Sequence, residues 1–159
     1  MNKKRISYSF ITMLMILTIS VTAFAALTET SAREIASKWM PDGTTYRLTK
    51  EDADEFEVYF FNKSLNTNYK VEINKFSAAI TEISGKVQDA HGSTIVNISE
   101  QQIQAIVMNE FPDATIQKIA LDTEDDYQVY EIKFTRGTSQ GDMDINPENG
   151  SIIKWEIKY

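Results

Sequence analysis

The sequence predicts an α+β protein made of two tandem units, each with a helix followed by four antiparallel strands. Three observations predict it: an amphipathic helical pattern that occurs twice, a Pro-Asp pair after each helix, and alternating apolar residues in the segments that follow. Equivalent positions in the two units lie about 72 residues apart. Because alternating strands bury one face only, we expect the helix of each unit to cover the apolar face of a sheet of its own.

Residues 1–25 are predicted to be a secretory signal peptide. Three basic residues precede a run from residue 6 to residue 28 without a formally charged side chain. A basic start, an apolar centre and small residues before the bond between Ala25 and Ala26 are typical of a signal cleaved there. The alternative is an uncleaved anchor over residues 6–28, since a membrane span needs ~20 residues. Both interpretations place the rest of the chain outside the cytoplasm, secreted or anchored.

Residues 28–84 form the first predicted unit. Ser31 and Glu34 have the spacing of a capping box, and Pro41 marks the end of the helix. The apolar positions of this helix are Ala32, Ile35, Ala36, Trp39 and Met40. The strand positions are Phe56, Val58 and Phe60, then Tyr69, Val71 and Ile73, then Ile80 and Ile83.

Residues 97–159 form the second predicted unit, and residues 85–96 connect the two. Ser99 and Gln102 have capping-box spacing before a second Pro-Asp pair. The apolar helix positions are Ile103, Ile106, Val107 and Phe111, and the strand positions are Tyr130, Ile132, Phe134, Gly141, Met143, Ile145, Ile152 and Trp155. Asn149 and Gly150 occupy the predicted turn before the last strand, where glycine adopts positive φ without a steric penalty.

The second unit resembles the PepSY domain family. The resemblance is carried by the helix that ends in Phe111 and Pro-Asp, by the Tyr-Glu-Ile strand from Tyr130 and by the turn at Asn149 and Gly150. The first unit is a degenerate PepSY-like unit, because residues 75–78 replace the glycine turn.

The resemblance implies an exported, non-catalytic protein that binds and restrains a protein partner, a secreted or envelope peptidase. It leaves open an alternative, a membrane-tethered regulator or adaptor of cell-wall enzymes that inhibits no protease.

Composition excludes several classes of function. The chain has no cysteine, so disulfide scaffolds, iron-sulfur clusters and a cysteine nucleophile are excluded. Its formal charge of -7 argues against a nucleic-acid partner, since such affinity depends on neutralising phosphates with Lys and Arg. The same charge opposes binding to an anionic lipid surface. The only membrane contact expected is therefore through the N-terminal segment.

No cofactor, metal ligand or catalytic residue is predicted. The two acidic runs are expected to be solvated hairpin loops, because neither has the glycine and distal glutamate of a calcium loop. These runs contain Glu51, Asp52, Asp54 and Glu55, and Asp122, Glu124, Asp125 and Asp126. Asp142, Asp144 and Asn146 resemble a calcium loop until Pro147 replaces the required glycine, and all three are expected on the wet face of a strand. His91 is expected to be a solvated residue of the connection.

Aromatic residues are the candidates for partner binding. Tyr127, Tyr130 and Tyr159 could line a sheet face that receives an extended peptide, and exposed strand edges also invite such pairing. Trp39 and Trp155 are expected in the core.

Overall fold

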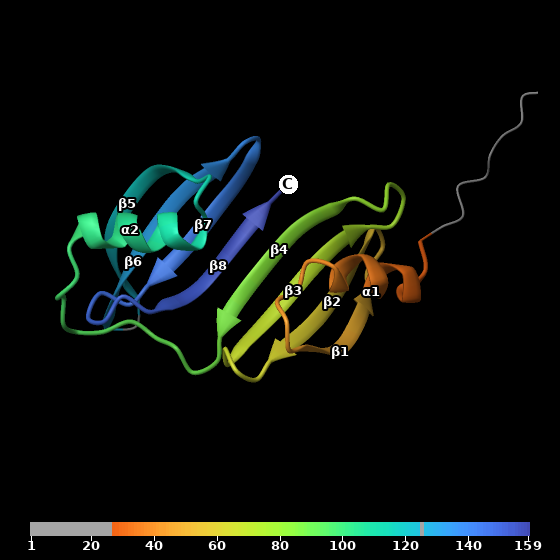
Figure 1. Ribbon diagram of the computed structural model, residues 1–159, viewed down its shortest axis with the longest axis horizontal. Helices are drawn as coiled ribbons and strands as arrows, with labels where there is room; N and C mark the ends of the chain where they lie inside the picture. Colours follow the sequence, from red (N-terminus) through yellow and green to blue (C-terminus); the bar gives the residue numbers. More distant parts are fainter. Residues whose placement is uncertain (1–26, 125) are drawn as a thin grey trace, which may run out of the picture.

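The computed structural model describes residues 27–124 and 126–159 (Figure 1). The predicted signal peptide, residues 1–25, and its cleavage site at Ala25 and Ala26 lie outside these residues. Within the described ranges, no helix has both the length and the apolar character needed to cross a membrane.

Eight antiparallel strands form one sheet with the order β1-β2-β3-β4-β8-β7-β6-β5 (Figure 1). A helix precedes strands one to four, and a second helix precedes strands five to eight, which confirms the predicted α+β class. The elements are α1 (Glu29–Ser37), β1 (Thr44–Glu51), β2 (Glu55–Asn62), β3 (Thr67–Asn74), β4 (Ile80–Val87), α2 (Glu100–Glu110), β5 (Thr115–Glu124), β6 (Tyr127–Arg136), β7 (Ser139–Ile145) and β8 (Ile152–Lys158).

The pairing of β4 with β8 joins all the strands into this single sheet. Ile83 lies opposite Ile157 in that pairing, and Gly85 lies opposite Trp155. The expectation that each helix covers a separate sheet is therefore wrong. Alternating apolar residues identify the buried face of a strand, but they do not identify the strand that lies beside it. Because β4 and β8 pair, neither strand is left with an exposed edge. Since β4 continues to Val87, the start of the predicted connection also belongs to the sheet.

The two helices begin in different ways. Ser99 and Gln102 form the predicted capping box of α2. At α1 the N-cap is Thr28, whose side chain accepts a hydrogen bond from the Ser31 backbone, so the predicted box at Ser31 and Glu34 is wrong. Because the helix begins at residue 29, the hydroxyl of Thr28 is in position to cap it, about one turn before the predicted cap at Ser31.

Each helix packs on the same face of the sheet over its own apolar cluster. The first cluster contains Ala32, Ala36, Phe56, Val58, Phe60, Tyr69, Val71, Ile73 and Ile83. The second contains Ile103, Val107, Phe111, Ala114, Tyr130, Ile132, Phe134, Met143, Ile145 and Ile157. Trp155 packs against both, with ring centroids 6.3 Å from Tyr69 and 5.5 Å from Phe111. The half-buried indole of Trp155 therefore connects the two clusters.

Trp39 does not lie in the core as expected. The helix α1 ends at Ser37, so Trp39 no longer follows the buried helical stripe, and it is 54% exposed. Its ring meets the ring of Tyr159 edge-on at 6.1 Å.

The turn that ends β3 and the turn that ends β7 have matching hydrogen bonds. The side-chain oxygen of Asn74 accepts from the backbone of Phe76 and Ser77, and that of Asn146 accepts from Glu148 and Asn149. Four residues after each asparagine the backbone enters the left-handed region, at Ala78 (φ 56°) and Gly150 (φ 75°). The first turn thus adopts its backbone conformation without glycine.

Candidate partner-binding face

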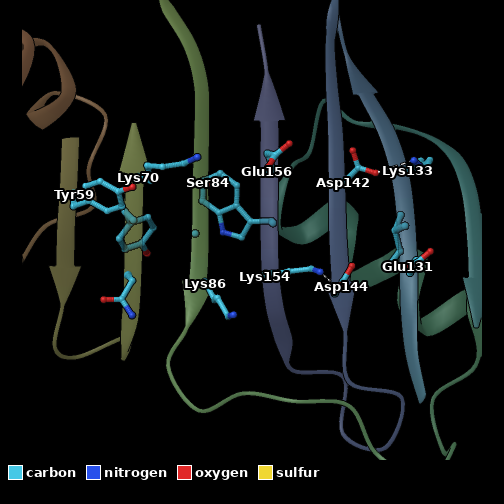
Figure 2. A pocket seen from close by; sticks show the side chains of 15 residues that line it. Tyr59, Lys70, Ser84, Lys86, Glu131, Lys133, Asp142, Asp144, Lys154 and Glu156 are labelled. Atoms are coloured by element: carbon cyan, nitrogen blue, oxygen red, sulfur yellow. Dashed lines mark ion pairs between the residues drawn. The ribbon is translucent and has the colours of Figure 1, made fainter. Parts of the chain in front are cut away.

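The sheet face opposite the helices, called here the open face, carries a groove of about 540 Å³ across β3, β4, β8, β7 and β6 (Figure 2). Residues from both halves of the chain line it, because the β4–β8 pairing runs through its middle. Its polar lining comprises Tyr59, Asn68, Lys70, Ser84, Lys86, Glu131, Lys133, Asp142, Asp144, Lys154 and Glu156. A groove with both acidic and basic groups can recognise a partner by charge pattern and position.

One row of charged residues crosses four neighbouring strands of the groove. Lys86 on β4 lies opposite Lys154 on β8, which lies opposite Asp144 on β7, which lies opposite Glu131 on β6. Figure 2 shows the Lys154 side chain extending toward Asp144, and their charged atoms are 2.8 Å apart. The row is therefore basic at the junction of the two halves and acidic toward the second half.

Asp144 lies on the open face as predicted, but neither Asp144 nor Asn146 is exposed to solvent as expected. The side chain of Asp144 is only 10% exposed, because it lies on a central strand and the side chain of Lys154, its ion-pair partner, covers it. Asn146 is buried, and its amide nitrogen donates to the backbone oxygen of His91 at 2.9 Å. Asp142 is exposed, as expected, and pairs with Lys133 at 3.3 Å.

A second ionic group occupies the end of the open face in the first half. Lys70 donates to Glu72 and lies 2.9 Å from Glu82. Burial disfavours the charged form of Lys70, but hydrogen bonds to these two carboxylates outweigh it and raise its pKa. Burial and the 2.7 Å hydrogen bond from the Tyr59 hydroxyl to Glu57 raise the pKa of Tyr59 to about 12. Both groups thus keep their protons at neutral pH.

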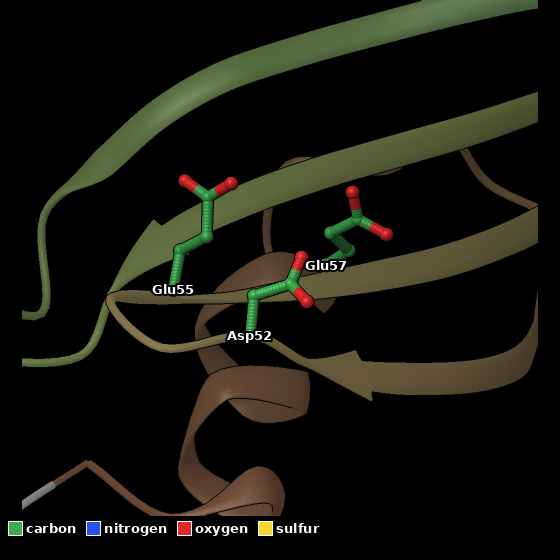
Figure 3. A group of neighbouring side chains, drawn as sticks. All are labelled: Asp52, Glu55 and Glu57. Atoms are coloured by element: carbon green, nitrogen blue, oxygen red, sulfur yellow. The ribbon is translucent and has the colours of Figure 1, made fainter.

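Three carboxylates gather beside the β1–β2 hairpin. Asp52 comes from the loop and Glu55 and Glu57 from β2, and their oxygens lie within 4.8 Å of one another (Figure 3). Burial raises the pKa of Glu55, and the nearby Glu72, Glu57 and Asp52 add to the effect. Hard cations such as Ca²⁺ take oxygen ligands of this kind, but six to eight of them. Asp52 is exposed in the hairpin loop, whereas Glu55 and Glu57 are half-buried in β2 and not in a loop.

Glu51 and Asp122, one from each run, interact with different neighbouring residues. Glu51 pairs with Lys75 at 2.6 Å. Asp122 lies within β5 rather than in a loop, and its carboxylate accepts from the Thr123 backbone. Asp126 follows with a φ of 70°, while residue 125 lies outside the described part of the chain.

The structure does not bring together the three tyrosines predicted to bind a partner. Tyr130 is buried under α2, and its hydroxyl donates to the backbone oxygen of Ile98 at 3.0 Å. It is therefore unavailable, and that prediction is wrong. Tyr127, three residues earlier on β6, points to the opposite face and is exposed, and Tyr159 is exposed beside Trp39.

The free edges of the sheet are β1 and β5. The strand β6, which carries Tyr127 and Tyr130, pairs with a neighbour on each side, so no extended peptide can add to it. Each free edge has an irregularity, between Tyr46 and Leu48 in β1 and between Ile116 and Lys118 in β5. Such irregularities weaken an edge as a template for pairing.

A second, smaller pocket of about 320 Å³ adjoins the groove where the connecting segment crosses the open face. His91 lies here with its ring centroid 5.3 Å from that of Tyr127. Lys86, Asp144 and Lys154 line both the pocket and the groove. Sequence reasoning missed these lysines, because only the β4–β8 register places them together.

Residues 97–156 match the family model described as "Peptidase propeptide and YPEB domain". This match confirms the predicted PepSY resemblance for that segment. It spans α2 and nearly all of β5 to β8, and hence the second-half side of the groove.

Two solved structures are similar to the chain at low identity. One is a protein from Clostridium difficile 630 assigned as a lipoprotein, with 17% identity, a TM-score of 0.37 and coverage of 84% of this chain and 94% of that chain. The other is the Bacillus megaterium YpeB C-terminal domain, with 12% identity, a TM-score of 0.45 and coverage of 82% of this chain and 62% of that chain. No curated protein sequence matches the chain.

Proposed function

We propose that the protein is an exported, non-catalytic regulatory module that binds a secreted or envelope peptidase and restrains it. The match of residues 97–156 to a domain described by its occurrence in peptidase propeptides carries this proposal. The open face offers the surface: β6, β7 and most of β8, which form one side of the groove, fall within the matched segment. We further propose that the two halves are tandem PepSY-like units, which the matching turns at Asn74 and Asn146 support.

The proposed export rests on the sequence of the N-terminal segment. A basic start and an uncharged run up to residue 28 favour a signal cleaved between Ala25 and Ala26. The length of the same run favours the second candidate function, a membrane-tethered regulator of cell-wall enzymes. The N-terminal sequence of the protein recovered from its host separates the two, since a start at Ala26 contradicts the tether.

Titration against the secreted peptidases of the host tests the proposed restraint. Peptide cleavage and the integrity of the added protein are followed together, and we expect saturable inhibition while the chain stays uncut. A chain that is cut without inhibiting is a substrate, and this result would overturn the proposal.

A matched pair of charge reversals tests the role of the groove. Lys133 lines the groove with an exposed side chain, whereas Lys63 lies in the β2–β3 turn outside it. Lys133→Glu should weaken inhibition about tenfold or more, and Lys63→Glu should leave it unchanged, because only the first alters a charge that the partner meets. Equal inhibition by both variants would place the partner on another surface.

A further inference from the structure

We propose that residues 94–96 of the connecting segment, called here the exposed segment, enter the active-site cleft of the partner peptidase in the manner of an extended substrate. This step rests on the proposed function, because it names the part of the chain that the peptidase binds. The exposed segment continues the surface already described. The residues just before it, Ala90 to Gly92, line the pocket of about 320 Å³ that adjoins the groove of the open face.

The exposed segment is fixed at both ends. Before it, Ser93 and Gln128 exchange two backbone hydrogen bonds of 3.0 and 2.9 Å. After it, the backbone nitrogen of Asn97 donates to the backbone oxygen of Pro147 at 2.9 Å. A segment with both ends held loses less conformational entropy when a partner orders it.

Between these two anchors most of the backbone is unpaired. The exposed segment belongs to no helix or strand, and its Ile95 nitrogen donates to the Ser93 hydroxyl at 3.1 Å. Its other two backbone nitrogens and all three backbone oxygens have no hydrogen-bond partner among residues 27–124 and 126–159. A cleft that binds an extended peptide holds its main chain by backbone hydrogen bonds. The exposed segment therefore presents the free donors and acceptors that such a cleft requires.

Two adjacent aliphatic side chains of the exposed segment are open to solvent. Ile95 is 49% exposed, and Val96 is exposed as well. Pockets that receive such side chains are apolar, and their burial in a partner is favourable. The structure thus indicates the class of partner: a peptidase whose specificity pocket accepts aliphatic side chains.

Two hairpin turns also expose large apolar side chains, Leu65 and Phe76, but their backbones are closed. The Leu65 nitrogen donates to the side-chain oxygen of Asn62, and the Phe76 nitrogen donates to that of Asn74. A backbone curled around an asparagine in this way cannot lie extended in a cleft. The exposed segment differs from these turns in its open backbone, so exposure alone does not explain the choice.

Limited proteolysis tests whether a peptidase cleft receives the exposed segment. The full chain, kept soluble in an uncharged detergent, is treated with small amounts of subtilisin or elastase, two unrelated peptidases that accept aliphatic side chains. Mass spectrometry then maps the cuts C-terminal to residue 26. We expect the first of these between Ser93 and Asn97, at least tenfold faster than any cut at Leu65 or Phe76. A first cut anywhere else in that part of the chain would overturn the proposal.

Matched substitutions test the exposed segment against the partner itself. Ile95→Asp should weaken inhibition of the host peptidase about tenfold or more, because burying a carboxylate in an apolar pocket is unfavourable. Leu65→Asp changes a side chain of similar exposure, 52%, outside the exposed segment and should leave inhibition unchanged. Both variants should keep the thermal midpoint of the wild type, since neither side chain is buried.

The outcomes separate this assignment from the proposed function. Equal inhibition by folded Ile95→Asp and Leu65→Asp would overturn the role of the exposed segment and leave the proposed restraint standing. First cuts at the exposed segment without inhibition of any host peptidase would refute the restraint, and would leave the exposed segment as the site where a peptidase engages the chain.

Discussion

The indole of Trp155 lies over Gly85, its partner across the β4–β8 pairing, so closely that a Cβ at Gly85 would be 2.8 Å from the indole nitrogen. Two other ring atoms would lie at 2.9 and 3.1 Å. The absence of a side chain at Gly85 thus leaves room for the ring that joins the two apolar clusters. A rigid indole in contact with both clusters has little freedom to move aside.

Gly85→Ala is therefore expected to lower the free energy of unfolding by about 1–3 kcal/mol, the typical cost of overpacking. Urea denaturation measures it, and Ser84→Ala, one residue away on the open face, is the control with a change within about 0.5 kcal/mol. In the background of Trp155→Leu the same alanine should cost much less, which a double-mutant cycle detects. An equal cost in both backgrounds would contradict the contact.

Ala78 and Gly150 allow a reciprocal pair of substitutions. A left-handed φ destabilises a non-glycine residue by roughly 1–2 kcal/mol. Glycine avoids this cost but lowers the free energy of unfolding by about 0.4–1 kcal/mol, because it increases the conformational entropy of the unfolded chain. Since Ala78 is exposed and loses no packing, we expect Ala78→Gly to stabilise the protein by about 0.5–1 kcal/mol. Gly150→Ala should destabilise it by about 1–2 kcal/mol, because the new Cβ also meets Ile106 at 2.9 Å.

The neighbouring alanine is the control for this pair. Ala79 has no positive φ, so Ala79→Gly should destabilise the protein by about 0.5–1 kcal/mol. Stability against chemical denaturant is measured for all three variants. A loss of stability in Ala78→Gly would show that the left-handed turn is not strained by alanine.

The sequence predicted the parts of the fold that local chemistry determines. A hydroxyl at Ser99, a glutamine three residues later and an apolar stripe are sufficient to define α2. The turn at Ala78 escaped prediction because alanine carries no signal for positive φ, and its geometry depends on Asn74 instead. A side chain that accepts two backbone donors can substitute for glycine in organising a turn.

The groove could not be predicted, because it depends on which strands become neighbours. The sequence placed Lys86 in the connection, because nothing local specifies that β4 continues to Val87 or that it pairs with β8. The same limitation explains Asp144, whose polarity predicted solvent although both flanking strands and Lys154 cover it. Tyr130 was misassigned for a related reason, since a tyrosine buries its ring when its hydroxyl finds a partner such as Ile98.

Of the two asparagines in the matched turns, Asn146 should cause the larger loss of stability when it is replaced. It is buried, accepts two backbone hydrogen bonds and donates one to His91, whereas the side-chain hydrogen bonds of the half-buried Asn74 are to Phe76 and Ser77 in its own turn. Asn146→Ala should destabilise the protein by about 2–3 kcal/mol, and Asn74→Ala by about 1–2 kcal/mol. Amide hydrogen exchange at Ser93 should accelerate in the first variant only. Equal acceleration in both would show that Asn146 does not hold the connection.

The hydroxyl of Tyr59 should titrate well above an ordinary tyrosine. Its pKa is raised to about 12 by burial and by its hydrogen bond to Glu57, against about 10 in the unfolded chain. A raised pKa stabilises the fold fully below pH 10, and this stability is lost as the pH rises through 12. The raised pKa of Lys70 acts in the same direction above its own unfolded value. Subtracting the phenolate absorbance titration of Tyr59→Phe from that of the wild type should leave a component with a midpoint near pH 12. A component near pH 10 would mean that Glu57 does not hold the proton in place.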